Sequence, residues 1–339
     1  MKTKFLVSSS PHIGSNLTTK KIMLHVIIAL GFPVIASTVI FGLYSLFIVL
    51  LAVGASVLGE TLYNLIRKRP NTVPDLSAVV TGLILGMNLP PTVPFYVPIV
   101  GGIFAIMVVK MLFGGLGQNF ANPAATARIF LSLAWPVQMT KFMNPLNYSN
   151  GAKDFVAGFT KTYVTSATPL VAIKDSIEVG GISSLNLLDM FLGRIGGSIG
   201  EVCSLTIIIA AVYLIVTKVI DWKILVTYVV TCAVLALAFY KDGYLYVLPT
   251  ILSGGILFAG VFMLTDYTTS PRTELGRIIF AVFAGLFTMI VRRFGGMPEG
   301  ACYSVLLANL IVPFIDKIVK PKPFGYVKPK KERKKKANV

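Results

Sequence analysis

The chain has 339 residues, of which 55% are hydrophobic and only 13% are charged, and its mean hydropathy is +0.78. Soluble globular domains carry roughly a quarter charged residues, so this composition excludes an ordinary soluble enzyme and indicates an integral membrane protein. The net charge of +17 comes from Lys and Arg clusters at the ends of apolar segments and near the end of the chain. That distribution orients membrane proteins, so nucleic acid is not an expected partner.

The first 21 residues are polar and basic, and we expect them to form a cytoplasmic N-terminus. They contain no apolar core of the kind found in a cleavable signal peptide. The three cysteines, Cys203, Cys232 and Cys302, lie singly in apolar segments without CxxC spacing. Buried thiols are therefore expected rather than a metal site or a disulfide.

Apolar segments of spanning or half-spanning length follow one another from residue 22 onward. We expect an all-α integral membrane protein with about ten transmembrane helices, divided into a first five-helix repeat at 22–137 and a second at 186–320. Residues 186–198 are short and Gly-rich, which predicts a re-entrant or interfacial piece. The expected helices are 22–42, 44–64, 76–89, 94–112, 123–137, 199–218, 224–240, 246–264, 276–292 and 301–318.

Basic clusters predict the orientation of these helices. The clusters at 20–21, 67–69 and 218–223 fall on one side when the spans alternate, and so does the basic tail 321–339. We expect a multi-pass membrane protein with both termini in the cytoplasm and the polar segment 138–185 outside. The tail is expected to bind anionic lipid headgroups of the bilayer.

An internal repeat relates the third to fifth apolar segments to the eighth to tenth. The run at 113–119 matches the run at 294–300, and both begin with Phe-Gly-Gly. Five spans in each half give the two copies opposite orientations, which predicts inverted repeats with broken half helices, as in transporters. Chance similarity between Gly-rich membrane segments is the alternative.

A short polar stretch, Thr-Ser-Ala-Thr-Pro-Leu at 165–170, stands out within the segment 138–185. Taken alone, such a stretch predicts a solvated turn whose hydroxyls bond to nearby backbone groups. Its interpretation changes with the motifs found in the rest of the chain.

Motifs along nearly the whole chain resemble those of the RnfD/NqrB family of membrane subunits. They are Ser10-Pro11-His12, Asp75 with Ser77-Ala78, the run 113–119, Asn122-Pro123-Ala124 with Arg128, the run 263–266 with Ser270-Pro271 and Gly276-Arg277, and the run 293–300. The short N-terminus and the sequence Ala-Thr-Pro-Leu at 167–170 resemble the RnfD branch more than NqrB, which has an N-terminal extension.

This resemblance implies FMN joined through its phosphate to a threonine hydroxyl by a flavin transferase. The family's motif resembles Asp-Gly-x-Ser/Thr-Gly-Ala-Thr, and its last residue falls on Thr168, with Thr165 in the Ser/Thr position. Ser166 stands where Gly is common, and Thr162 stands where the Asp is expected. Attachment requires an accessible hydroxyl in a flexible extracytoplasmic segment, and Pro169 is expected to keep the chain out of a helix.

Further candidate flavin-binding residues surround the first Gly-rich turn. Gly114 and Gly115 let the backbone approach a ligand closely, Asn119 and Asn122 supply amides, and Arg128 is an intramembrane charge that needs a partner. The turn is expected near the cytoplasmic face, so a single flavin would not contact both it and Thr168. The resemblance implies a noncovalent riboflavin or an ion path here, and a broken-helix turn capped by the Asn side chains is the alternative.

Acidic residues in or beside the spans are candidates for ion coupling. The best candidate, Asp266, matches the family's Thr-Asp motif, and Thr265 beside it offers a hydroxyl oxygen, although a helix cap would explain the same residues. Carboxylates with hydroxyls serve Na⁺ and H⁺ equally, so the coupling ion stays open. The acidic candidates are Glu60, Asp75, Asp189, Glu201, Asp266 and Glu299.

By resemblance, the chain is an electron-transfer subunit of an Rnf-type complex in a bacterial or archaeal cytoplasmic membrane. The complex couples electron flow between reduced ferredoxin and NAD to Na⁺ or H⁺ translocation. The implied partners are a flavinylated G-type subunit, iron–sulfur membrane subunits of A and E type, and soluble B- and C-type subunits. No dinucleotide-binding Gly motif and no Cys cluster is found, so the chain is not expected to be catalytic alone. The alternatives are a small-solute or ion channel or secondary transporter, which would carry no flavin, and a quinone-reducing subunit like NqrB.

Overall fold

The computed structural model describes residues 18–145, 159, 164–166, 168–171, 173, 186–240, 243–295 and 299–320. In these residues the fold is helical apart from two short antiparallel strands, β1 (Phe142–Met143) and β2 (Thr165–Ser166). The tail 321–339, the N-terminus before residue 18 and most of 138–185 lie outside the described residues, so their predicted roles stay predictions.

The first half begins where the Thr18 hydroxyl caps a helix by accepting from the Lys21 backbone N–H at 3.3 Å. Gly42, with a φ of 83°, then makes the sharp turn between the first two long helices, a conformation that suits glycine. The elements of this half are α1 (Thr19–Phe41), α2 (Leu43–Ile66), the 3₁₀ turn η1 (Val73–Asp75), α3 (Ser77–Met87), α4 (Tyr96–Ile103), the π-helical stretch η2 (Phe104–Met111), α5 (Pro123–Ala134) and α6 (Pro136–Met139).

The second half contains a helix broken in the middle. Its two parts, α13 and α14, meet at a bend of 55°, and Gly254 at the break has a φ of 62°. This break lies inside the expected apolar segment 246–264, and its position there was not predicted from the sequence. The elements are α10 (Leu187–Leu192), α11 (Ser204–Val216), α12 (Trp222–Phe239), α13 (Gly243–Leu252), α14 (Ile256–Phe262), α15 (Glu274–Phe294) and α16 (Ala301–Ile318).

The all-α membrane fold is confirmed, because each of the expected apolar segments coincides with a helix or with two consecutive helices. Five helices of the described residues are long and apolar enough to cross a membrane, or six if α13 and α14 form one span. The helices α3, α5 and α11 are shorter, as is α4 taken together with η2. The count of ten spans therefore stays a prediction.

The two halves pack through equivalent pairs of helices, α1 against α11 and α5 against α16. The chain before α11 also pairs with the end of α3, where the Gly200 backbone N–H donates to Met87 O at 2.6 Å. Within the first half, Gly82 allows α2 and α3 to approach closely, because a Cβ there would lie 2.6 Å from Val53 Cα. One apolar core runs through both halves. The inverted orientation of the repeat stays a prediction.

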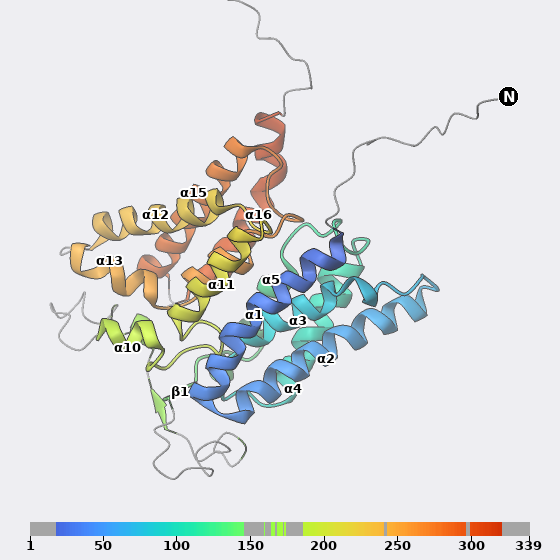
Figure 1. Ribbon diagram of the computed structural model, residues 1–339, viewed down its shortest axis with the longest axis horizontal. Helices are drawn as coiled ribbons and strands as arrows, with labels where there is room; N and C mark the ends of the chain where they lie inside the picture. The colour runs from blue at the N-terminus through green and yellow to red at the C-terminus, as the bar shows by residue number, and fades with distance from the viewer. Residues whose placement is uncertain are drawn as a thin grey trace, which may run out of the picture.

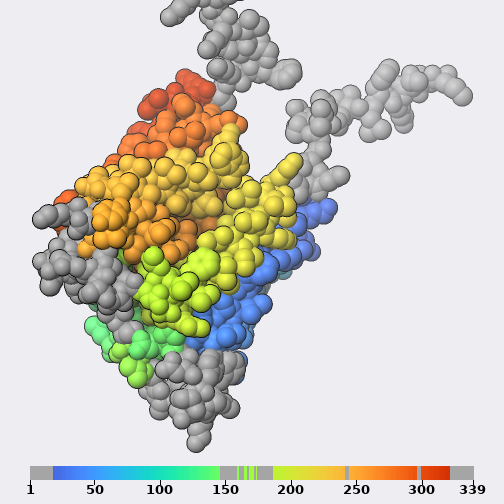
Figure 2. Space-filling view, turned by 60° about the vertical axis from the view of Figure 1, so that its left-hand side comes forward, coloured from blue at the N-terminus to red at the C-terminus, as the bar shows by residue number. Residues whose placement is uncertain are grey.

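The figures show which elements lie on opposite sides of the molecule. The start of α1 and the end of α16 lie toward the upper side of Figure 1, and β1 and α10 lie toward the lower side. In the space-filling view, α10 covers the surface between the orange helices of the second half and the blue helices of the first (Figure 2). Strand pairing places Thr165 and Ser166 beside β1, so these two residues of the predicted attachment motif lie away from both described ends of the chain (Figure 1).

Candidate functional site

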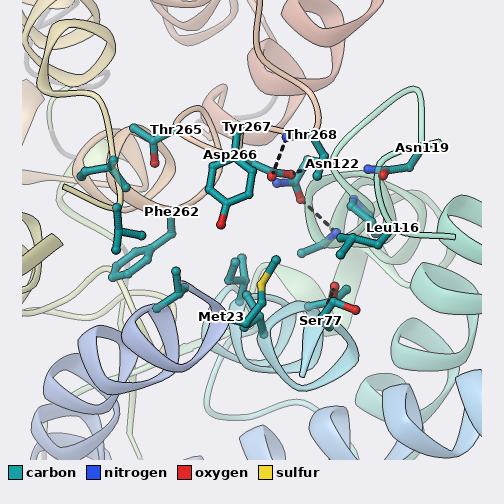
Figure 3. Close-up of a pocket in the computed structure, with 18 of the residues that line it drawn as sticks. Met23, Ser77, Leu116, Asn119, Asn122, Phe262, Thr265, Asp266, Tyr267 and Thr268 are labelled. Atoms are coloured by element: carbon teal, nitrogen blue, oxygen red, sulfur yellow. Dashed lines mark hydrogen bonds between the residues drawn. The ribbon is translucent and has the colours of Figure 1, made fainter. Parts of the chain in front are cut away.

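A cavity of about 80 Å³ lies between the two halves, where the start of α5 meets the chain that follows α14. Figure 3 shows Asp266, Tyr267 and Thr268 on one side of this cavity and Met23 and Ser77 on the other. We call it the Asp266 cavity. Its polar lining residues are Ser77, Thr81, Lys110, Asn119, Asn122, Thr265, Asp266, Tyr267 and Thr268.

Asn122 connects the two halves at this cavity. Its Oδ1 accepts from the Ala124 and Ala125 backbone N–H groups at 3.1 and 3.2 Å, which caps α5, and its Nδ2 donates to Met263 O of the second half at 3.4 Å. The capping alternative is therefore confirmed for Asn122. Asn119 Nδ2 donates to Ala121 O at 3.0 Å within the same turn.

The Asp266 carboxylate lies in the turn after α14, where its Oδ1 accepts from the Thr268 backbone N–H at 3.1 Å and its Oδ2 from Thr268 Oγ1 at 2.8 Å. Burial raises the pKa of this carboxyl above its usual value, and the hydrogen bonds from Thr268 oppose the rise. Thr265 Oγ1 donates to Val261 O at 2.5 Å, so its oxygen keeps lone pairs for another partner. The predicted pair of Asp266 and Thr265 thus lines a cavity together.

A buried ion pair, which sequence reasoning missed, lies in the wall of the Asp266 cavity. Lys110 Nζ is 2.9 Å from Glu60 Oε2, with side-chain exposures of 3% and 0%, and Nζ also donates to Ser77 Oγ at 2.5 Å. The sequence identifies Glu60 as a candidate on its own, but not Lys110. The sequence did contain a signal for this pair, namely a lysine inside the apolar segment 94–112, because a charged residue within a membrane span has a charged partner or a function.

Arg128 lies six residues beyond Asn122 along α5 and belongs to a second cavity, of about 60 Å³. Its guanidinium donates to Asn88 Oδ1 at 3.1 Å and to Ser198 Oγ at 3.3 Å, and it forms an ion pair with Glu299. The predicted flavin-binding residues are therefore divided between two cavities. Asn119 and Asn122 line the Asp266 cavity, and Arg128 lines the second cavity, which we call the Arg128 cavity.

The glycines of the first turn have the conformations that their identity predicts. Gly114 and Gly115 have φ angles of 124° and 103°, which only glycine adopts without strain. Gly114 and Gly115 line neither the Asp266 cavity nor the Arg128 cavity. Their role in ligand binding stays a prediction.

Thr168 differs from its expected setting. Thr168 is only 5% exposed in the folded chain, although attachment of a flavin requires an accessible hydroxyl. Residues 169–171 form a helical turn, and the Val171 backbone N–H donates to Thr168 O at 3.0 Å. Pro169 therefore begins a helical turn instead of preventing one, because the first helical position needs no N–H donor. Residues 162 and 167 lie outside the described residues.

Thr168 Oγ1 is buried and has no hydrogen-bond partner among the described residues. Buried hydroxyls are normally hydrogen-bonded, so this one is consistent with an oxygen that bonds to a group outside the described residues. No cluster of three or more His, Cys, Asp or Glu residues that could hold a metal ion occurs in the described parts of the chain.

Comparison with known proteins shows the family. The model of the family described as NQR2, RnfD, RnfE matches residues 6–325. The chain belongs to this NQR2, RnfD, RnfE family. The resemblance to RnfD is thereby confirmed. The family and the apolar helices together show that the chain is a multi-pass membrane protein.

Similar proteins from three bacteria match this family member over almost its whole length. The D subunit of the Na(+)-translocating ferredoxin:NAD(+) oxidoreductase complex of Acetobacterium woodii is 43% identical, with 97% of this chain and 98% of that protein covered. The D subunit of the proton-translocating ferredoxin:NAD(+) oxidoreductase complex of Clostridium ljungdahlii is 37% identical, with coverages of 96% and 97%. The D subunit of the ion-translocating oxidoreductase complex of Escherichia coli O7:K1 is 33% identical, with coverages of 96% and 99%.

Proposed function

We propose that the chain is the D-type membrane subunit of an Rnf complex, which couples electron flow between reduced ferredoxin and NAD to translocation of Na⁺ or H⁺, and that it carries FMN covalently on Thr168. The names of its relatives support membership of such a complex. The observation that carries the flavin proposal is the buried Thr168 hydroxyl without a partner among the described residues.

Attachment requires chemistry that the chain does not provide alone. A flavin transferase would join Thr168 Oγ1 to the FMN phosphorus of a flavin dinucleotide, so that the pyrophosphate bond breaks and the nucleoside monophosphate leaves with the hydroxyl proton. Because Thr168 is 5% exposed in the folded chain, the segment must be reached before it packs or while it is displaced. Once attached, FMN supplies one-electron transfer.

Neighbouring subunits supply the rest of the electron path in this proposal. They are a flavinylated G-type subunit, iron–sulfur membrane subunits of A and E type, and soluble B- and C-type subunits. The Asp266 cavity is the proposed place of ion coupling or of a noncovalent riboflavin, because it contains a carboxylate, several hydroxyls and two amides between the halves. Movement of one half against the other would change its shape.

The test of the flavin proposal uses the denatured chain produced together with a flavin transferase. We expect a fluorescent band on a gel under ultraviolet light and a peptide containing Thr168 that carries the mass of FMN less water. Thr168→Val should abolish both signals, and Thr61→Val, on the exposed surface of α2 and outside the motif, should leave them in place. A wild-type chain without fluorescence and without the added mass would contradict the flavin proposal. Solute flux through a channel or transporter would then be measured.

The ion proposal is tested in the complex reconstituted in vesicles. Asp266→Asn keeps a similar shape but no ionisable group, so we expect FMN on Thr168 at the wild-type level and loss of ion transport. Unchanged transport of both Na⁺ and H⁺ by this variant would exclude Asp266 from the ion path.

A further inference from the structure

Among the described residues, Arg292 is a buried cation without an acidic partner. It lies near the end of α15 with an exposure of 5%, and no carboxylate of the described residues lies within 4.0 Å of it, whereas Lys110 and Arg128 both have one. Glu201 acts on it only from a greater distance. A buried charge without a partner is costly, so this position requires an explanation.

The guanidinium is held at the break between α13 and α14. Its Nη1 donates to Thr250 O at 2.8 Å and its Nη2 to Ser253 O at 3.1 Å. These bonds satisfy carbonyls at the end of α13, but a carbonyl compensates a cation less well than an anion does. Arg292 therefore has a fixed position and direction, with part of its hydrogen-bonding capacity unused by the described residues.

The unused groups lie together. Arg292 Nε, Ser253 Oγ and Thr250 Oγ1 are all buried without hydrogen-bond partners among the described residues, and Ser253 and Thr250 are exposed by 0% and 1%. The Tyr240 hydroxyl also lies close to Thr250 and to the guanidinium. One guanidinium N–H and two hydroxyls are donors of the kind that bind a phosphate.

This donor cluster borders the segment that contains Thr168. A Cβ added to Gly254 would lie 2.7 Å from Arg292 Nη2 and 3.5 Å from Leu170 Cδ1, so both side chains contact the same small residue. Leu170 follows Thr168 by two positions, and Thr168 Oγ1 is itself buried without a partner in the described structure. Three polar groups that the described residues leave unsatisfied thus adjoin a chain segment that contains a fourth.

We propose that Arg292, Ser253 and Thr250 form an anion site that holds the phosphate of the flavin attached to Thr168. This inference rests on the proposed flavin attachment and adds the residues that bind its charge. A phosphodiester carries one negative charge, which would neutralise Arg292 and accept from the free donors.

The competing explanation is that Arg292 serves only to close the end of α13. Two substitutions separate the explanations, because they remove hydroxyls that have no partner in the described structure. Ser253→Ala and Thr250→Val should leave the thermal unfolding of the flavin-free chain unchanged, since they break no hydrogen bond between described residues. A purely structural role predicts that they leave the flavin unchanged as well.

The experiment compares these variants and Arg292→Lys with wild type, each co-produced with the flavin transferase. The measurements are the fraction of Thr168 peptide that carries FMN and the reduction potential of the attached flavin. We expect Arg292→Lys, which keeps the charge but loses the guanidinium fork, to lower attachment about tenfold or to shift the potential. Arg293→Lys is the matched control, because Arg293 is half-buried beside the Phe294 ring.

The outcomes distinguish the two proposals. Wild-type attachment and potential in Arg292→Lys, Ser253→Ala and Thr250→Val would overturn the anion site and leave flavin attachment standing. Equal losses in Arg293→Lys would also overturn it, because they would show a general effect of α15. An unmodified Thr168 in the wild-type chain would overturn the proposed function and the anion site together.

Discussion

Two buried cations occupy opposite situations in this protein. Lys110, in the wall of the Asp266 cavity, is 2.9 Å from Glu60 and bonds to Ser77, so its charge is balanced by the chain itself. Arg292, near the segment that contains Thr168, has only backbone carbonyls as described partners. A buried charge needs compensation. For Lys110 the compensation comes from Glu60, and for Arg292 it comes from the phosphate of the proposed anion site.

The largest expected effect is that of Lys110→Met, which leaves Glu60 buried without its partner. We expect the chain to lose about 3–5 kcal/mol of unfolding free energy, the cost of breaking a buried ion pair, measured by denaturation in detergent. Arg292→Met in the flavin-free chain should cost about 1–2 kcal/mol, because it removes two hydrogen bonds and also an uncompensated charge. Equal losses in the two variants would contradict the distinction between the two cations.

A smaller loss is expected from Arg128→Met, which breaks the pair with Glu299. The Glu299 side chain is 22% exposed, so water can solvate the carboxylate that remains. We expect about 1–3 kcal/mol, chiefly from the unpaired polar groups of Asn88 and Ser198, again by denaturation in detergent. A loss as large as that of Lys110→Met would show that exposure of the acid does not moderate the cost.

Ser77→Ala sharpens the description of the Lys110 pair. The substitution removes the hydrogen bond from Nζ and the one that Ser77 Oγ donates to Asp75 Oδ1, while the ion pair with Glu60 remains. We expect a loss of about 1–2 kcal/mol. Thr61→Ala on the exposed side of α2 is the control and should change stability by less than about 0.5 kcal/mol.

The smallest effect is the pH dependence contributed by Asp266. Because its pKa is raised in the folded state, the folded chain binds the proton more tightly than the unfolded chain does. The protonated form therefore favours folding below the ordinary Asp pKa, and this contribution is lost as the pH rises through the raised pKa. Asp266→Asn should flatten this part of a plot of unfolding midpoint against pH. An unchanged slope would show that the carboxyl titrates normally.

Much of the fold was predictable because its causes are local. The length of each apolar segment, the capping residue Asn122 and the glycines at the breaks act within a few neighbours in sequence. The assignment of helices on either side of the polar segment 138–185 was correct for this reason.

The candidate site was predictable only in part. Asn119, Asn122, Thr265 and Asp266 were identified separately, and the structure brings them together in one cavity. Lys110 was missed, although its place in an apolar segment was a visible signal. Arg292 was also missed, because the matching motif begins one residue later, at Arg293.

The sequence by itself determined the membrane location, the helices, their breaks and the family, since these depend on hydrophobic length, local capping and motifs in order. Only the tertiary structure decided which charges are paired, which hydroxyls the described residues leave without partners, and that Arg128 belongs to a different cavity from Asn122. The physical reason is that compensation of a buried charge depends on distance in space. Glu60 and Lys110 meet across 50 positions of sequence, and no local pattern encodes that contact.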